Sequence, residues 1–267
     1  MREAFILALP LSLAACATTG PSVLQGVPDF PEPAHISASV PDGFDATWWL
    51  TRASPDFSSS EIFVVSGSEA TRAAISNGGY DAAPAHWNRG VLFTSTREGG
   101  WDLWFADDDG ELSRLPEPVN SPASECCSVV LPDGNFLFSS DRGGDWSIYQ
   151  AVIVPDGYEV RPLAGSVNSE HGEWPSYVSP DGTLLLFSSI RPDGIGGDDI
   201  YVSQLGREGW NLPCLLPEPV NRDGYEDGAS IVNGQLIWSA RPPEAGALSQ
   251  IYTWPAHLAL SDCGAAP

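Results

Sequence analysis

The chain has 267 residues, 35 of them Asp or Glu and 12 of them Arg, with no Lys, and its formal net charge at pH 7 is −23. Repulsion between like charges argues against binding to nucleic acid or to an anionic lipid surface. The 27 Gly and 24 Pro residues favour many turns over long helices, and a hydrophobic fraction of 42% is enough for a packed core.

An export signal is predicted over residues 1–15. Arg2 precedes an apolar run over residues 5–11, which is too short to span a bilayer. The run ends in Leu13-Ala14-Ala15-Cys16, which resembles the lipobox of bacterial lipoproteins. The resemblance implies that Cys16 becomes the lipidated N-terminus and that acyl chains are the only membrane attachment. Because Ala17 rather than Asp follows, we expect an outer-membrane lipoprotein that faces the periplasm.

The next segment, residues 16–33, is rich in Pro and predicts a tether with little regular structure. The remaining chain divides into a repeat region over residues 34–260 and a C-terminal tail over residues 261–267.

Five copies of one unit make up the repeat region. In each copy an Arg follows an apolar strand, and these residues are Arg52, Arg97, Arg142, Arg191 and Arg241, at steps of 45, 45, 49 and 50 residues. An aromatic residue precedes each Arg, and a triplet of polar, apolar and aromatic residues follows it, as in Asp199-Ile200-Tyr201. A Val-Asn pair separates several copies, as at Val119-Asn120, and Ser76-Asn77 is a poor match to it.

A period of about 40–50 residues with several short strands is typical of a β-propeller blade with four strands. In the fourth copy we place strands at residues 175–179, 184–188 and 199–203, with a fourth near 211–216. No segment has a sustained helical period of apolar residues, so we expect almost no helix. Single blades cannot bury their faces alone, so the five copies predict one all-β domain.

The third and fourth copies carry the pattern Pro-Asp-Gly, then Phe-Ser-Ser, Arg, Gly-Gly or Gly-x-Gly-Gly, and Ile-Tyr, starting at Pro132 and Pro180. This pattern resembles the TolB-like, WD-repeat-like β-propeller family. The resemblance covers residues 34–255 and implies a propeller in the cell envelope. The family has six blades, whereas about 45 residues per copy leaves room here for five, with six as the alternative.

Closing the ring requires a strand from the opposite end of the chain, because the fifth copy lacks material for a good fourth strand. Two alternatives are open. The segment around residues 23–27 supplies that strand, or residues 257–260 complete the blade alone.

Two series of charged residues recur from copy to copy. The repeated Arg residues suggest a ring of ion pairs lining a pore, or, in the structural interpretation, braces between loops. Carboxylates also precede the first strand of several copies, where they would cluster at one mouth of the central channel with His171; these are Asp81, Glu125, Glu173 and Asp227, or Glu226 in place of the last. Converging carboxylates attract a cationic peptide or bind calcium, although they also serve as hydrogen-bonded loop residues.

No local catalytic motif is present. The run Asp107-Asp108-Asp109-Gly110-Glu111 lacks the spacing of a calcium loop and is better interpreted as a turn, as are residues 193–199. The four His residues show no zinc-binding spacing, and no cofactor is indicated.

Four Cys residues besides Cys16 permit two disulfides in an oxidising compartment. A Cys214–Cys263 bridge would tie the tail to the fourth copy. Cys126 and Cys127 are adjacent on a predicted strand, so we expect their side chains on opposite faces, either as free thiols or bonded.

The sequence therefore favours a monomeric, non-enzymatic propeller that binds an unidentified protein of the cell envelope, with Trp87 and Trp174 in an exposed aromatic patch. The alternative is a hydrolase or lyase acting on glycans or peptides, with the channel-mouth carboxylates as its acid and base.

Overall fold

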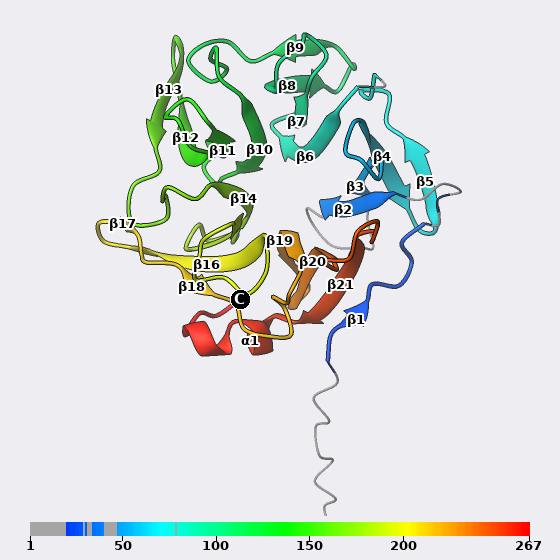
Figure 1. Cartoon of the computed structure of the whole chain (residues 1–267). Coiled ribbons are helices and arrows are strands. Elements are labelled where there is room, and N and C mark those ends of the chain that lie inside the picture. Colours follow the sequence, from blue (N-terminus) through cyan, green and yellow to red (C-terminus); the bar gives the residue numbers. More distant parts are fainter. Residues whose placement is uncertain (1–19, 29, 31–33, 40–46, 78) are drawn as a thin grey trace, which may run out of the picture.

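The computed structural model describes residues 20–28, 30, 34–39, 47–77 and 79–267. Five antiparallel sheets stand around a common centre as the blades of a propeller (Figure 1). The five-bladed, all-β fold that the repeats predict is confirmed. The export signal, Cys16 and residues 17–19, 29 and 31–33 of the tether lie outside the described residues.

Each blade runs from an innermost to an outermost strand. Blade 1 contains β2 (His35–Ser39), β3 (Trp48–Ala53), β4 (Ser60–Ser66) and β5 (Glu69–Arg72). Blade 2 contains β6 (Asp81–Trp87), β7 (Gly90–Ser95), β8 (Asp102–Asp107) and β9 (Leu112–Arg114). Blade 3 contains β10 (Glu125–Val130), β11 (Phe136–Ser140), β12 (Ser147–Val154) and β13 (Gly157–Pro162).

The last two blades depart from this simple order. Blade 4 contains β14 (Glu173–Val178), β15 (Leu184–Ser189), β16 (Asp199–Gly206) and two short outer strands, β17 (Gly209–Trp210) and β18 (Cys214–Leu215). Blade 5 contains β19 (Tyr225–Val232), β20 (Gln235–Arg241), β21 (Gln250–Pro255) and β1 (Ser22–Val23). The helix α1 (Ala256–Ala259) and the 3₁₀ helix η1 (Ser261–Cys263) follow.

The predicted strands of the fourth copy differ from the structure mainly at its outer edge. The expected fourth strand is split into β17 and β18. Pro213 lies between these two strands, and because proline has no N–H, it cannot donate to the neighbouring β16.

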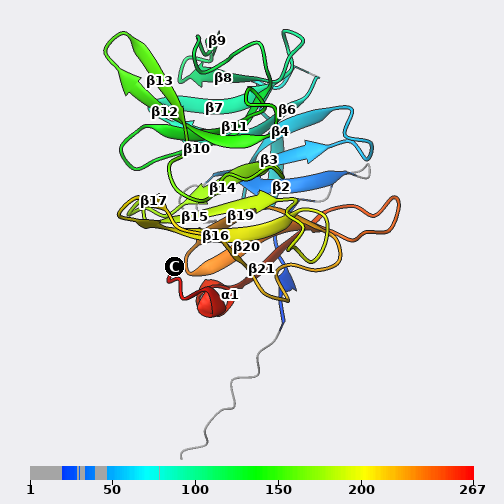
Figure 2. The same ribbon diagram turned by 60° about the vertical axis from the view of Figure 1, so that its left-hand side comes forward.

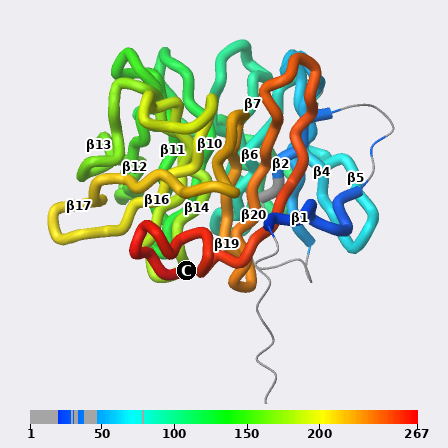
Figure 3. The backbone as a smooth tube through the Cα atoms, turned by 60° about the horizontal axis from the view of Figure 1, so that its bottom comes forward, coloured from blue at the N-terminus to red at the C-terminus, as the bar shows by residue number. Residues whose placement is uncertain are grey.

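The ring closes through the N-terminal segment. Ser22 and Val23 pair antiparallel with Thr253 and Tyr252, and the Leu24 N–H donates to the Ile251 carbonyl at 2.8 Å. Figures 2 and 3 show β1 beside β21 at the edge of blade 5. Of the two alternatives for closure, the N-terminal strand is therefore confirmed, and it lies slightly earlier than residues 23–27.

The core lies between neighbouring blades. One cluster packs β7 and β8 of blade 2 against β11 and β12 of blade 3, and it includes Leu103, Phe136 and Phe138, all 0% exposed. Similar clusters join blade 3 to blade 4 and blade 4 to blade 5, where Ala259 and Leu260 of the C-terminal segment take part. Each blade thus depends on its neighbours for burial of its faces.

The C-terminal segment is held to blade 4 by a disulfide between Cys214 and Cys263. This is the bridge that the cysteine count suggested. In the described part of the chain, no helix is long and apolar enough to cross a membrane.

Candidate functional site

The repeated Arg forms a buried brace in blades 2, 3 and 4. Arg97 donates from Nη2 to the Ile75 carbonyl at 2.8 Å and to the Asp81 carboxylate at 3.1 Å. Arg142 bonds to the Val119 carbonyl and to Glu125, and Arg191 bonds to the Val167 carbonyl and to Glu173. The three carboxylates are 0% exposed. The geometry agrees with the loop-bracing interpretation of the repeat.

The linkers, the segments that join the outermost strand of one blade to the innermost strand of the next, supply the second half of the brace. Asn120 accepts from the Leu103 N–H at 2.8 Å and donates to the Leu103 and Leu115 carbonyls. Asn168 and Asn221 bond in the same way to strands β12 and β16, and Ser76 takes this place in front of blade 2. The N–H after each of these residues donates to the carboxylate that begins the next innermost strand.

Two aromatic rings hold each bracing guanidinium. The guanidinium carbon of Arg142 lies 5.3 Å from the ring centre of Phe138 and 5.0 Å from that of Tyr149. Arg97 lies over Phe93 and Trp104, and Arg191 over Phe187 and Tyr201, at similar distances. Each guanidinium therefore has a carboxylate, a backbone carbonyl and an aromatic pair as its surroundings.

The sequence-based alignment of Arg52 and Arg241 with this series is wrong in register. In blades 2–4 the Arg comes four residues after the aromatic, as in Phe138 and Arg142. In blade 5 Trp238 pairs with Tyr252 as Phe138 pairs with Tyr149, so the fourth residue after the aromatic is Pro242.

Arg52 and Arg241 have other surroundings. Arg52 occupies the position in blade 1 that Ser140 occupies in blade 3, and it pairs with Glu61 on the neighbouring strand. Nη1 of Arg52 lies 3.7 Å from Oε2 of Glu61. Arg241 precedes by one residue the position that corresponds to Arg142, and its guanidinium carbon lies 3.9 Å from the ring centre of Tyr225.

Glu226 is the blade 5 counterpart of the braced carboxylates. It pairs with Ala240 as Glu125 pairs with Ser140. Blade 5 therefore lacks the Arg that bonds the carboxylate in blades 2–4 and the Ser hydroxyl that bonds it in blades 2 and 3. Its Oε2 accepts from the Arg222 N–H at 3.2 Å, and within the described residues Oε1 accepts no hydrogen bond. Glu226 is 2% exposed, and burial raises its pKa to about 8.

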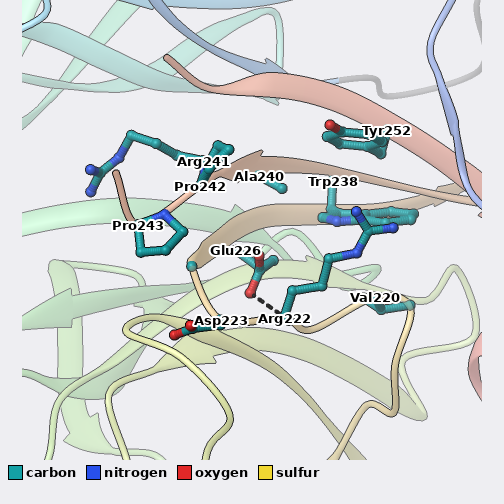
Figure 4. Close-up of a pocket in the computed structure, with 11 residues that line it drawn as sticks. Val220, Arg222, Asp223, Glu226, Trp238, Ala240, Arg241, Pro242, Pro243 and Tyr252 are labelled. Carbon is teal, nitrogen blue, oxygen red and sulfur yellow. Dashed lines mark hydrogen bonds between the residues drawn. The ribbon is translucent and has the colours of Figure 1, made fainter. Parts of the chain in front are cut away.

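A cavity of about 160 Å³ opens beside Glu226. The linker residues Val220 and Arg222, the aromatic pair Trp238 and Tyr252, and Arg241 to Pro243 contribute to its walls. Figure 4 shows the Glu226 carboxylate directed into this space and the side chain of Arg241 directed away from it. We call this cavity the blade 5 slot.

The predicted channel-mouth residues do not form one cluster of free carboxylates. Asp81, Glu125 and Glu173 each pair with the Arg of their own blade. The side chain of Asp227 is accessible to solvent, but the protein around it limits its hydration. This desolvation, together with the like charge of Asp198, raises the pKa of Asp227 to about 7. His171 lies 3.8 Å from the Glu170 carboxylate, and it does not line the slot.

In the acidic loops around Asp107 and Asp199, these two carboxylates accept hydrogen bonds from backbone N–H groups of the same loop. Asp107 Oδ1 accepts from the N–H groups of Asp109 and Glu111, as expected for a turn between β8 and β9. Asp199 Oδ2 accepts from Ile195 and Gly196. Within the described ranges, no three His, Cys, Asp or Glu side chains are grouped to hold a metal ion.

The adjacent cysteines differ from the expectation of opposite faces. The register of β10 against β11 shifts between Cys126 and Val129, and Cys127 has a φ of 60°. This β-bulge breaks the alternation of side chains, so the two Sγ atoms lie 2.6 Å apart. The structure has both as free thiols, and burial raises the pKa of Cys126.

One face of the ring carries the linkers and the loops between the second and third strands of each blade, and we call it the linker face. Hydrogen bonds from the Glu125 and Glu226 N–H groups to the Trp101 and Asp198 carbonyls join these loops to the next blade. Five exposed apolar residues lie in or next to these segments: Phe57 at 45%, Trp101 at 37%, Ile190 at 50%, Ile195 at 40% and Tyr225 at 38%. Other exposed apolar residues, such as Leu205 and Leu212, lie outside them.

Neither of the two residues expected in the exposed aromatic patch is exposed. Trp87 is only 5% exposed and donates to the Gly134 carbonyl, because it sits in the core between blades 2 and 3. Trp174 is half-buried against Trp146.

Sequence reasoning named Glu226 only as an alternative to Asp227, and it missed Trp238, Pro242 and Tyr252. A usable signal was present. Counting from the aromatic residue gives four positions to Arg in three copies and three positions in the fifth, which marks Arg241 as displaced.

Comparison with known proteins supports the fold alone. A hypothetical protein from Leishmania major matches with a TM-score of 0.53 and 15% identity, over 88% of this chain and 91% of that chain. A gluconolactonase from Xanthomonas campestris matches with a TM-score of 0.51 and 12% identity, over 85% and 97%. TolB from Acinetobacter baumannii matches with a TM-score of 0.48 and 16% identity, over 86% of this chain and 66% of its own length. No protein-family model and no curated protein sequence matches the chain.

Proposed function

We propose that this chain is a non-enzymatic binding module of the cell envelope, and that it recognises a partner protein through the linker face. The observation that carries the proposal is the set of exposed apolar residues on that face. Aromatic residues are enriched at the centres of protein interfaces, where Trp and Tyr contribute most of the binding free energy. Trp101 and Tyr225 come from different blades, so one partner surface would span several blades.

The charge of the molecule indicates what kind of partner fits. With a formal net charge of −23, the chain attracts basic surfaces and repels acidic ones. Complementary charge accelerates association and suppresses wrong partners. The partner is therefore a protein with a basic segment rather than nucleic acid.

The cellular location rests on the sequence and on one structural feature. Leu13-Ala14-Ala15-Cys16 provides a lipidation signal, which would place the protein in the outer membrane facing the periplasm. A disulfide between Cys214 and Cys263 suits an oxidising compartment of that kind.

In-cell crosslinking of the tagged lipoprotein, followed by mass spectrometry, tests the proposal. We expect one dominant envelope protein, lost in Trp101→Glu and retained in the matched control Leu205→Glu. Leu205 is 48% exposed and lies at the hairpin end of β16, away from the linker face. Equal capture by both variants, or no captured protein at good expression, would sink the proposal.

One observation favours a hydrolase as the second candidate. Glu226, with a pKa raised to about 8 by burial, is protonated at neutral pH as a general acid must be, and Asp223 lines the same cavity. Turnover of lactone, glycoside or peptide substrates that disappears in Glu226→Gln would establish this function instead.

A further inference from the structure

Blade 5 keeps the surroundings of a bracing guanidinium without the Arg that belongs in them. The carboxylate is Glu226, the linker carbonyl is that of Val220, and the aromatic pair is Trp238 and Tyr252, whose ring centres are 5.8 Å apart. In blade 3 the corresponding rings, Phe138 and Tyr149, are 6.0 Å apart with Arg142 beside them.

Both acceptors of the slot are unused. In blades 2, 3 and 4 the linker carbonyl and the carboxylate both accept from one guanidinium. In blade 5, no hydrogen bond to the Val220 carbonyl or to Glu226 Oε1 occurs among the described residues. Burial raises the pKa of Glu226 to about 8, so the slot on its own holds a neutral carboxyl group at neutral pH. A guanidinium that enters the cavity would supply the missing donor and favour the charged carboxylate.

Arg222 lines the slot and makes part of the contacts of the missing arginine. Its Nε donates to the Pro219 carbonyl at 3.1 Å, and its guanidinium carbon lies 5.8 Å from the Tyr252 ring centre. Its guanidinium forms no ion pair with Glu226 within the described part of the chain. Arg222 is exposed, so its side chain can turn away when another group enters.

We propose that the blade 5 slot binds a guanidinium group, and that this group is the side chain of an arginine presented by the partner protein. The identity of the source rests on the proposed function, whereas the chemistry of the slot does not. The fold itself supplies the template, because it fills the same surroundings with an arginine side chain three times.

The slot suits guanidinium better than other ligands. The N–H donors of a guanidinium group form a planar fork that reaches a carboxylate and a carbonyl together, and its flat face stacks on aromatic rings. An ammonium group is a point charge without such a face. An anion would meet two oxygen acceptors at the inner end of the slot and would be repelled by the net charge.

Titration calorimetry on the purified mature lipoprotein in detergent tests the chemistry with three probes. Nα-acetyl-arginine amide is expected to bind, and Nα-acetyl-lysine amide, which keeps its side-chain ammonium, is expected to bind at least about tenfold more weakly. The uncharged isostere Nα-acetyl-citrulline amide is expected not to bind. Equal binding of the arginine and citrulline probes, or no binding of the arginine probe, would overturn the proposal.

Four variants locate the binding. Pro242→Arg places a guanidinium at the position of Arg142 and is expected to abolish probe binding. The matched control Pro192→Arg, at an exposed proline in the corresponding loop of blade 4 that does not line the slot, is expected to retain it. Glu226→Gln is expected to weaken binding at least about tenfold. Arg222→Ala is expected to bind as tightly or more tightly, because a like charge leaves the slot. Binding that is unchanged in both Pro242→Arg and Glu226→Gln refutes the assignment.

Crosslinking of Pro242→Arg in cells separates this inference from the proposed function. Capture that is lost in Trp101→Glu and unchanged in Pro242→Arg supports a protein partner and rejects the arginine assignment. Probe binding without any captured partner rejects the proposed function and leaves a slot for a free guanidinium compound. Free arginine that binds as tightly as an arginine-containing peptide also points to that source.

Discussion

At the scale of single residues, the molecule contrasts braced carboxylates with an unbraced one. Glu125 and Glu226 occupy equivalent positions, yet only Glu125 has a guanidinium partner. A paired buried charge depends on its partner, whereas an unpaired one shifts its pKa toward the neutral form. The two residues therefore respond differently to mutation and to pH.

Removing one brace should cost far more than removing the displaced Arg. Arg142→Ala leaves the 0% exposed Glu125 carboxylate uncompensated, and we expect the free energy of unfolding to fall by about 3–5 kcal/mol. Arg241→Ala removes a stacking contact with Tyr225, and we expect a loss of about 1 kcal/mol or less. Urea denaturation measures both. Adding Glu125→Gln to Arg142→Ala should recover part of the loss, and similar values for the two single variants would contradict the brace.

Glu226 should make stability depend on pH. Because its pKa is raised to about 8 in the folded state, the folded protein holds this proton more tightly than the unfolded chain does. That stabilisation is complete below the unfolded pKa and is lost as pH rises through 8. We expect the free energy of unfolding to fall by about 2 kcal/mol between pH 6 and pH 9 through this group. Urea denaturation of Glu226→Gln should show a smaller fall, and identical pH profiles would be inconsistent with this assignment.

At the scale of elements, blade 5 depends on segments from both ends of the repeat region. β1 contributes only Ser22 and Val23 to the sheet, and the following Leu24 and Val27 pack against the core cluster of blades 1 and 5. At the other end, the two alanines of α1 pack in the cluster between blades 4 and 5, and the disulfide joins the following η1 to β18 of blade 4. Contacts outside the sheet thus compensate for a very short edge strand.

The packing of Leu24 should matter more than the pairing of β1. Leu24→Ala is expected to lower the free energy of unfolding by about 1–2 kcal/mol, less than for a fully buried leucine because Leu24 is half-buried. Val23→Ala, at a side chain that is 41% exposed, should change it by less than about 0.5 kcal/mol. Equal effects in thermal or urea denaturation would show that the closing segment is not anchored through Leu24.

The disulfide should stabilise the region between β18 and η1. It joins residues separated by 49 positions, and a loop of that size is worth about 4 kcal/mol in the chain-entropy model. The double variant Cys214→Ser/Cys263→Ser should therefore unfold at lower urea concentration. If reduction of the unaltered protein leaves its urea midpoint unchanged, the bridge has no such role.

At the scale of the whole molecule, the repeated sequence unit predicts the fold, and the blade 5 slot lies where one copy departs from that unit. Pro-Asp-Gly turns recur in two copies, Val-Asn linkers at three boundaries and an Arg after an apolar strand in all five copies, so five blades could be predicted from one sequence. Pro242 at an Arg position is easily missed, since Arg241 next to it imitates the repeat, and only the spacing of three residues from Trp238 to Arg241 reveals the shift before β20 and β21 are paired. The contact between Cys126 and Cys127 was equally hidden, because a β-bulge is not encoded by alternation of residue types.

The lipid anchor proposed at Cys16 concerns the whole molecule. Cys16→Ala should move the protein from the membrane fraction to the soluble fraction of the envelope, because the acyl chains are then missing. Immunoblotting of separated fractions measures this. Membrane association that persists in Cys16→Ala, and survives high salt, would contradict anchoring through that residue.

Closure of the ring by β1 also sets an order of events during biogenesis. Residues 22 and 23 pair with residues 252 and 253, so the segment made first waits for the segment made last. Until both segments are available for pairing, blade 5 lacks its outermost strand and its sheet has an open edge. A chaperone or a protease would have access to this open edge during that interval. Pairing of β1 with β21 ends the interval, because it covers the edge.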